Sequence, residues 1–272
     1  MIVSQKADKK KTLIAIAILV TIVTVGIILF IALPGASSDS IFKDAKKGDI
    51  ITFGSYEQDG NTANGAEPIE WEVLDADGDS VLVVSCYVLD CVPYNEGLSD
   101  VTWENCTLRT WLNRDFYDRA FSPEEQGLIL ESTVLNMDNE YYGKSGGNNT
   151  KDKLFCLSVD EIYRYYEFNA VHDEDGFRAS EALITGATPA ASSTKLYTHE
   201  ITIHDFQNIL AAENYSENCI GKTGCIWWTR SPAGGDVGAC RVYDIGDVGW
   251  DDDGGNAEPD VTGVRPAMRL QR

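Results

Sequence analysis

The chain has 272 residues, of which 43 are acidic and 22 are lysine or arginine, so its formal net charge is −21. This charge excludes a nucleic-acid-binding protein of the usual basic type, because such a field would repel a polyanion. Hydrophobic residues make up 43% of the chain, which excludes disorder by composition and provides for one sizeable core, or at most two. The charge is unevenly distributed, since four lysines lie within residues 1–11.

Residues 12–33 form an apolar stretch without a charged residue that ends at Pro34. As a helix this stretch would span roughly 33 Å, close to the hydrocarbon thickness of a bilayer. We therefore predict a single N-terminal transmembrane helix over residues 12–33, with a cleaved signal peptide as the alternative. The preceding lysines favour a cytoplasmic basic stub, residues 1–11, and an extracellular C-terminal part in a single-pass protein of the cell membrane.

The remaining chain divides into a linker, residues 34–47, and one extracellular domain, residues 48–272, because no second long linker appears. Its seven cysteines have no C-x-x-C spacing, which argues against a structural zinc site and a thioredoxin-type motif. Cys219 and Cys225 bracket a glycine-containing turn and are the best candidates for a local disulfide. The alternative is that most of the cysteines are reduced and buried.

Strand patterns open this domain, helix patterns follow, and short strand-like runs close it. An apolar stripe predicts a helix over residues 107–117, and capping boxes at Ser122 and Ser158 predict two more helix starts. The pattern around residues 203–210 suggests one further short helix. Strands are expected at residues 50–56, 69–74, 80–85, 154–157, 225–230, 239–243 and 264–270. This order predicts an α+β fold with a mixed or antiparallel sheet.

No catalytic constellation is evident in the sequence. The three histidines lack the spacing of a helical zinc site, and no nucleophile elbow, phosphate loop or dinucleotide fingerprint is present. Residues 236–260 are more informative, because glycine and aspartate alternate there with Tyr243 and Trp250, which predicts exposed loops. Such loops are typical of binding surfaces. The acidic run 251–253 could also ligate Ca²⁺, although a solvated acidic loop is the alternative.

Four stretches in this order resemble the bacterial domain of unknown function 6273 family: PIEWEVL at 68–74, TWENCTLRTWLN at 102–113, WWTRSP at 227–232 and GVRPA at 263–267. The resemblance covers roughly residues 48–270. Cys106 replaces the usual serine, and Thr229 the usual leucine. The resemblance implies a C-type-lectin-like mixed sheet with two flanking helices, distantly related to the formylglycine-generating sulfatase-modifying enzymes.

The resemblance also implies particular contacts. The first and last strands, residues 50–56 and 264–270, would pair with each other. Trp227 and Trp228 would lie in the core, and Arg265 would be a buried or half-buried anchor for an ion pair. These family motifs would then have a structural role, and a family motif need not be a binding site.

Some relatives of this fold are targets of diversity-generating retroelements, which vary surface residues near the C-terminus. In this sequence the corresponding small, polar and aromatic residues are expected to bind a ligand; they are Tyr243, Asp244, Asp247, Trp250, Asp251, Asp252, Asp253 and Asn256. Such a target would require an imperfect repeat of the 3′ end of the gene nearby in the genome, differing only at adenines.

We therefore expect a membrane-anchored extracellular module, not an enzyme, that displays its C-terminal loops to an extracellular protein or glycan ligand. No nucleic-acid partner and no cofactor other than Ca²⁺ is expected. One alternative is a structural cell-envelope domain without a discrete ligand. The other is an enzyme on the formylglycine-generating type of scaffold, for which Cys240 would be the candidate thiol.

Overall fold

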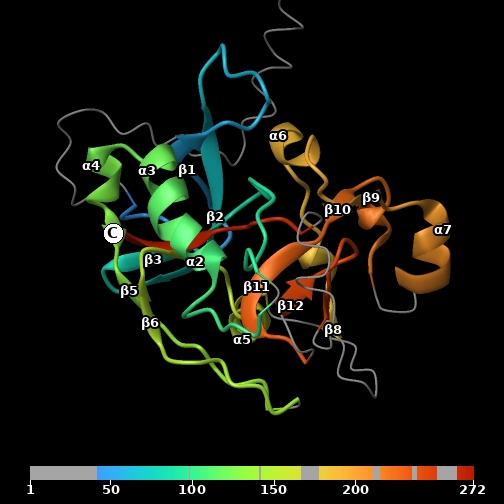
Figure 1. Ribbon diagram of the computed structural model, residues 1–272. Coiled ribbons are helices and arrows are strands. Elements are labelled where there is room, and N and C mark those ends of the chain that lie inside the picture. The colour runs from blue at the N-terminus through green and yellow to red at the C-terminus, as the bar shows by residue number, and fades with distance from the viewer. Residues whose placement is uncertain are drawn as a thin grey trace, which may run out of the picture.

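The computed structural model describes residues 42–97, 99–140, 142–166, 178–210, 215–234, 238–249 and 262–272. These residues form an α+β fold with many strands and few helices, which confirms the predicted class (Figure 1). The predicted transmembrane helix, residues 12–33, lies outside the described residues. Within the described ranges, no helix combines the length and the hydrophobicity that a membrane span requires.

A central sheet contains six of the described strands in the order β1-β2-β3-β14, with β4 and β7 both pairing with the far edge of β14. Every pairing between these strands is antiparallel. The bounds are β1 Ile50–Tyr56, β2 Glu67–Asp77, β3 Ser80–Ser85, β4 Ile129–Leu130, β7 Leu154–Phe155 and β14 Ala267–Gln271.

The expected pairing of the first and last strands is wrong. β14 pairs with β3, where Ala267 lies opposite Val84 and Gln271 opposite Ser80. The tight turn at residues 78–79 makes β2 and β3 a hairpin, and β1 occupies the other edge of β2. The edge of β3 that remains is therefore the one available to β14.

The hydrophobic pattern of the strands matches their burial. Ile69, Trp71 and Val73 alternate along β2 and are fully buried, as the period of two predicts. In β3 all residues from Val81 to Val84 are buried, because both faces of this strand are covered.

A continuous helical segment packs beside β1. It consists of α2 (Thr107–Trp111), the π-helical turn η2 (Leu112–Phe116) and α3 (Tyr117–Ala120). In the predicted apolar stripe Leu108, Leu112 and Phe116 are buried and Trp111 is half-buried, and the ring of Phe116 lies 4.9 Å from that of Tyr56. Both predicted capping boxes are present, at the starts of α4 (Pro123–Gln126) and α5 (Val159–Tyr165).

A second antiparallel sheet has the order β11-β12-β13-β8 and shares the main hydrophobic core. Its strands are β11 Trp227–Pro232, β12 Ala239–Val242, β13 Asp247–Gly249 and β8 Arg178–Ala179. Strands β9 (Thr198–Glu200) and β10 (Thr223–Cys225) form a separate pair. The remaining short helical elements are η3 Glu181–Leu183, α6 Pro189–Ser192, α7 Ile203–Asp205, η4 Phe206–Leu210 and η5 Glu217–Cys219.

The predicted structural roles of the family motifs are confirmed. Trp227 and Trp228 are fully buried. Arg265 is 3% exposed; its Nε donates to Ser85 O at 2.7 Å, and its Nη2 lies 3.4 Å from Glu72 Oε2.

All seven cysteines are among the described residues, and none of them forms a disulfide. Cys225 lies in the main core, whereas Cys219 belongs to a small second core with Ile201, Leu210 and Tyr215. The proposed Cys219–Cys225 disulfide is therefore absent, and the alternative of buried, reduced thiols describes five of the seven.

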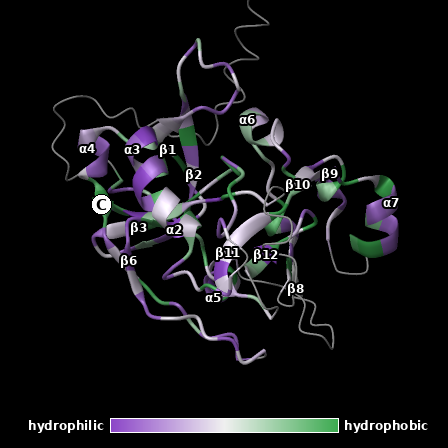
Figure 2. Ribbon diagram, viewed as in Figure 1, coloured by the Kyte–Doolittle hydropathy of each residue, from purple (hydrophilic) through white to green (hydrophobic). Residues whose placement is uncertain are grey.

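A polar arm extends from this body. It comprises residues 132–152, that is β5 (Ser132–Val134), β6 (Thr150–Asp152) and the connection between them, drawn in yellow-green in Figure 1. Figure 2 shows it mostly in the colours of polar residues. Strands β5 and β6 pair antiparallel, and the backbones of Asn139 and Lys144 exchange two hydrogen bonds of 2.8 and 3.1 Å near the tip.

Gly54 lies at an irregularity in β1, where the register with β2 shifts between Thr52 and Ser55. Its φ of +69° belongs to the left-handed region that favours glycine. A Cβ at this position would lie 2.6 Å from the ring of Phe121 and 2.7 Å from Ala120 O. The close approach of the segment after α3 to β1 thus depends on a glycine.

Replacing Gly54 by alanine should therefore lower the free energy of unfolding by roughly 2–5 kcal/mol, because backbone strain and a steric clash add. Gly60→Ala is the matched control, since Gly60 has a φ of +79° but no atom within 4 Å of a Cβ. It should cost only about 1–2 kcal/mol. Chemical denaturation of both variants measures the difference, and equal losses would contradict the steric argument.

Candidate functional site

Three of the eight residues predicted to bind a ligand are described: Tyr243, Asp244 and Asp247. All three are half-buried in or beside the turn between β12 and β13. The ring of Tyr243 lies against the Arg241 guanidinium at 5.4 Å, and burial raises the pKa of Asp244. The other five lie outside the described residues; they are Trp250, Asp251, Asp252, Asp253 and Asn256.

The prediction of exposed loops is wrong for residues 238–249, whereas the strand expected at residues 239–243 is present as β12. None of these residues is exposed, because β12 and β13 pair within the second sheet. Gly249 allows this packing, since a Cβ there would lie 2.4 Å from the Tyr243 ring. The aromatic residue thus fills space inside the sheet.

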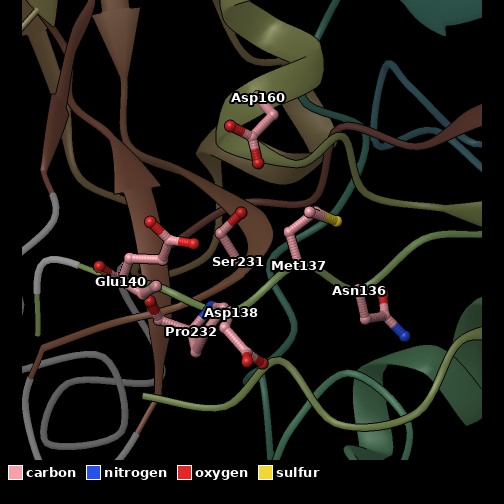
Figure 3. A pocket seen from close by; sticks show the side chains of 8 residues that line it. Asn136, Met137, Asp138, Glu140, Asp160, Ser231 and Pro232 are labelled. Carbon is pink, nitrogen blue, oxygen red and sulfur yellow. The ribbon is translucent and has the colours of Figure 1, made fainter. Parts of the chain in front are cut away.

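A groove lies between the arm, α5 and the end of β11. It consists of two adjoining hollows of about 520 and 280 Å³, and Met137 and Asp160 line both. Figure 3 shows the larger hollow, to which the arm, the start of α5 and β11 each contribute side chains. Leu135 and Met137 are 52% and 58% exposed, although both are large and apolar. The groove therefore presents apolar contact area to solvent.

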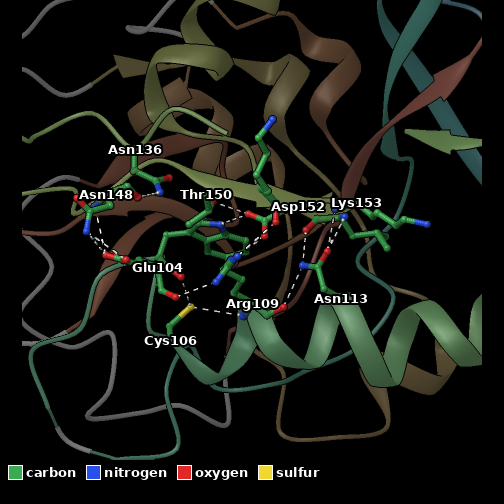
Figure 4. A network of polar contacts seen from close by, with 12 residues as sticks. Glu104, Cys106, Arg109, Asn113, Asn136, Asn148, Thr150, Asp152 and Lys153 are labelled. Atoms are coloured by element: carbon green, nitrogen blue, oxygen red, sulfur yellow. Dashed lines mark hydrogen bonds and ion pairs between the residues drawn. The ribbon is translucent and has the colours of Figure 1, made fainter. Parts of the chain in front are cut away.

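The base of the arm is fixed by the helical segment (Figure 4). The carboxylate of Asp152 is buried and accepts hydrogen bonds from Trp103 Nε1 at 2.9 Å, Arg109 Nε at 2.7 Å and Thr150 Oγ1 at 2.6 Å. Asn113 Oδ1 accepts from the backbone N–H groups of residues 153 and 154. Trp103, Arg109 and Asn113 all belong to the 102–113 motif, so this motif holds the arm.

The middle of the arm is fixed by Arg230, which is 3% exposed in β11. Its Nη2 donates to Leu135 O at 3.0 Å and to Glu161 Oε1 at 2.9 Å, and its Nη1 donates to Cys156 O at 2.8 Å. One guanidinium thus joins the arm, α5 and β11. Near the tip, Asn139 Nδ2 donates to Pro232 O at 2.9 Å.

The two hollows differ in charge. The larger one is lined by Asp138, Glu140 and Asp160, and none of its described lining residues is cationic. We call it the acidic hollow. The smaller one is lined by Arg164, Arg230 and Arg269 together with apolar side chains, among them Leu82, Val134 and Phe155. We call it the basic hollow, and its Glu161 is already paired with Arg230.

Burial makes three of the described thiols poor nucleophiles at neutral pH. Burial raises the pKa of Cys106 to about 11 and that of Cys225 to about 12. Burial likewise raises the pKa of Cys86 to about 12. A thiol with such a pKa remains protonated near pH 7, and the thiolate is the reactive form.

One group of three carboxylates among the described residues lies close enough to share a cation. The ligand atoms of Glu57, Asp59 and Glu67 lie within 4.8 Å of one another. Two of these acids also accept hydrogen bonds from their own loop: Glu67 Oε2 accepts from Gln58 N at 2.7 Å, and Asp59 Oδ2 accepts from Asn64 Nδ2 at 2.7 Å. Glu57 Oε1, in contrast, is buried and has no hydrogen-bond partner.

Comparison with known families supports the resemblance seen in the sequence. The family described as a domain of unknown function, DUF6273, matches residues 78–272. The chain belongs to the DUF6273 family. The match includes every residue of the groove, whereas the 68–74 motif lies before it. No curated protein and no solved structure gives a significant match to this DUF6273 chain.

Apart from Arg230, Ser231 and Pro232 of the 227–232 motif, the sequence patterns do not single out the residues that line the groove of this DUF6273 protein. Leu135 and Met137 stand in a polar stretch, which is an indication of exposure that could have been used. Asp160 was assigned only to a capping box, and Arg164 and Arg269 had no motif role. Their common location depends on tertiary structure, since β14 carries Arg269 to the arm.

Replacing Arg230 by glutamine should lower the free energy of unfolding by about 3–5 kcal/mol, because Leu135 O and Cys156 O lose their buried donor and Glu161 loses its partner. Urea denaturation measures the loss. Arg114→Gln is the control, since the Arg114–Asp115 pair is exposed, and it should leave the midpoint unchanged. A midpoint for Arg230→Gln equal to that of the control would contradict the role given to Arg230.

Proposed function

We propose that this DUF6273 protein is a membrane-anchored extracellular ligand-binding module and that the groove is its binding surface. The observation that carries the proposal is the exposure of Leu135, which lines the basic hollow, and of Met137, which lines both this hollow and the acidic one. Exposed apolar side chains with a charged rim are typical of surfaces that bind a partner. The arm that carries them is held at its base, middle and tip, so the surface is preorganised.

The anchoring and the finer fold are part of the proposal. The uncharged stretch 12–33 supports a single membrane helix, and the lysines before it support a cytoplasmic N-terminus. The ordered family motifs support a C-type-lectin-like arrangement. The helical segment 107–120 and α5 are the two helices that would flank its sheet.

A binding function is favoured over an enzyme by the chemistry of the cysteines. Cys240 is fully buried, and its Sγ lies 3.3 Å from Pro232 O. A formylglycine-type reaction would need an accessible and reactive thiol, whereas this one is shielded by the second sheet.

The C-terminal residues remain a second part of the proposed binding surface. Trp250, the acidic run 251–253 and Asn256 follow β13 in the sequence. The acidic run is proposed to ligate Ca²⁺, and these residues are proposed to be diversified by a retroelement. The described Tyr243, Asp244 and Asp247 support this less, because they are half-buried.

Replacing Leu135 and Met137 together by aspartate should abolish binding of a cell-surface ligand without affecting folding, because both side chains are exposed. The full chain would be expressed in a bacterial host, and intact cells screened against glycan and surface-protein panels with Ca²⁺ or with a chelator. Protease added to the intact cells should remove the binding, which tests the extracellular location.

Two controls make this screen decisive. Ile203→Asp changes a similarly exposed apolar residue, 54% exposed on α7, and should leave binding unchanged. Replacing Trp250 and residues 251–253 by serine tests the C-terminal loops. Loss of binding only in the latter variant would move the binding surface there, and no binding by any form would favour a structural cell-envelope domain.

In the folded protein the buried Cys106, Cys225 and Cys240 should each react only slowly with a maleimide at pH 7.5, and Cys240→Ser should label at the rate of the wild type. For Cys106 and Cys225 the rate should rise as the pH approaches about 11–12, because their thiolates form only there. Labelling is followed by mass spectrometry, with urea-denatured protein as the reference. Rapid labelling of folded Cys240 would favour the enzyme.

A further inference from the structure

The basic hollow contains two arginines, Arg164 and Arg269, that form no ion pair with a described residue. Arg164 lies over the Tyr165 ring at 5.4 Å, and Arg269 Nη1 makes only a long contact of 3.4 Å with Ser80 Oγ. In a chain with 43 acids against 22 cations, two neighbouring arginines without a carboxylate partner are unexpected.

The wall of the same hollow is apolar. Leu82, Val134, Leu135 and Phe155 line it beside the two guanidinium groups. A ligand that fits this surface carries a carboxylate next to an aliphatic or aromatic group, because a guanidinium binds a carboxylate with two parallel hydrogen bonds. The acids that face the hollow are Asp160 and Glu161, and Glu161 is held by Arg230.

The acidic hollow has the opposite preference. Glu140 and Asp160 are exposed, and no described residue donates a hydrogen bond to either carboxylate. Asp138 differs, because its Oδ1 accepts from Ser145 Oγ at 3.1 Å and from Gly146 N at 2.8 Å. The site thus offers two available carboxylates to a cationic group and a third that shapes the arm.

Each hollow also has one buried polar atom without a hydrogen-bond partner. Asn136 lines the acidic hollow and is 9% exposed, and its Oδ1 has no hydrogen-bond partner, whereas its Nδ2 donates to Asn148 O at 2.8 Å. Arg230 lines the basic hollow, and its Nε has no partner. An acceptor is therefore left over at the acidic end and a donor at the basic end, although buried polar groups are usually satisfied.

We propose that the groove binds a short peptide with free termini, with the C-terminal carboxylate at Arg164 and Arg269 and the ammonium group at Glu140 and Asp160. This inference rests on the proposed binding function and adds the class of ligand. Leu135 and Met137 lie between the two ends and contact the side chains of the peptide. The shared lining by Met137 and Asp160 lets one extended molecule occupy both hollows.

The test uses the full chain in detergent micelles and the tripeptide Ala-Ala-Leu, with affinity measured by isothermal titration calorimetry. The C-terminal amide of this peptide should bind about 10- to 100-fold more weakly, because it cannot form a charged bidentate contact. Acetylation of its N-terminus should weaken binding by about 10-fold or more, because the resulting amide is uncharged and loses the charge-assisted hydrogen bonds of the ammonium group to Glu140 and Asp160.

Variants assign each end. Arg164→Gln with Arg269→Gln should reduce affinity for the free acid to that of the amide and leave the affinity for the amide unchanged. Glu140→Gln with Asp160→Asn should likewise reduce the affinity for the peptide with a free N-terminus to that of the N-acetylated peptide and leave the affinity for the N-acetylated peptide unchanged. Arg114→Gln is the matched control, because it removes an exposed arginine elsewhere. Equal affinities for acid and amide, or no effect of the two arginine changes, would overturn the proposal.

Two further probes distinguish a peptide carboxylate from that of an amino acid or a fatty acid. They also distinguish failure of the peptide proposal from failure of the binding function. Leucine alone and decanoate should both bind more weakly than the tripeptide, since neither spans both hollows with complementary charges. If the chain binds decanoate best, or binds only ligands from the cell-surface screen in a manner sensitive to Leu135→Asp and Met137→Asp, the peptide is the wrong class and the binding function stands. If those aspartate changes affect no binding but the replacement of Trp250 and residues 251–253 does, the groove is not the binding surface and the peptide proposal fails. If no form of the chain binds any ligand, the binding function itself fails.

Discussion

The geometry of the groove depends on the hydrogen bonds and the ion pair that the buried Arg230 guanidinium forms. A cation that is 3% exposed must be compensated, and the partners come from three separate parts of the chain: the arm, the end of β7 and α5. Moving any of these parts away would leave part of a buried guanidinium without a hydrogen-bond partner, and moving α5 would also remove its counter-charge, which costs more than the ion pair contributes. The arm is mostly polar and has little core of its own, so this constraint fixes its position.

The motifs that identify the family fit this arrangement. Trp103, Arg109 and Asn113 hold the base of the arm, whereas Arg230 and Pro232 hold its middle and tip. These residues do not line the open side of the acidic hollow, with the exception of Pro232. The family motifs therefore position a surface, and the residues that would choose a ligand lie between the fixed points. The residues that hold the arm in place are thus different from most of those that would determine ligand specificity.

Local features were predictable, and long-range ones were not. The capping boxes at Ser122 and Ser158 and the alternation along β2 follow from short-range geometry, so the sequence pattern identified them. The partner of β14 and the meeting of the arm with α5 depend on segments far apart in the chain. Residues 238–249 show a further limit, because a stretch rich in glycine and aspartate forms buried strands when the glycines make room for a neighbouring ring.

The position of β14 also affects how the chain reaches its native state. It follows every other described element in the sequence, yet it lies inside the central sheet between β3 and the pair β4 and β7. While the ribosome is still adding these residues, β3 has an unpaired edge and uncovered valines, a combination that invites intermolecular association. Completion of the sheet therefore has to wait until β14 has been synthesised, and a chaperone that shields β3 up to that point would raise the yield of folded protein.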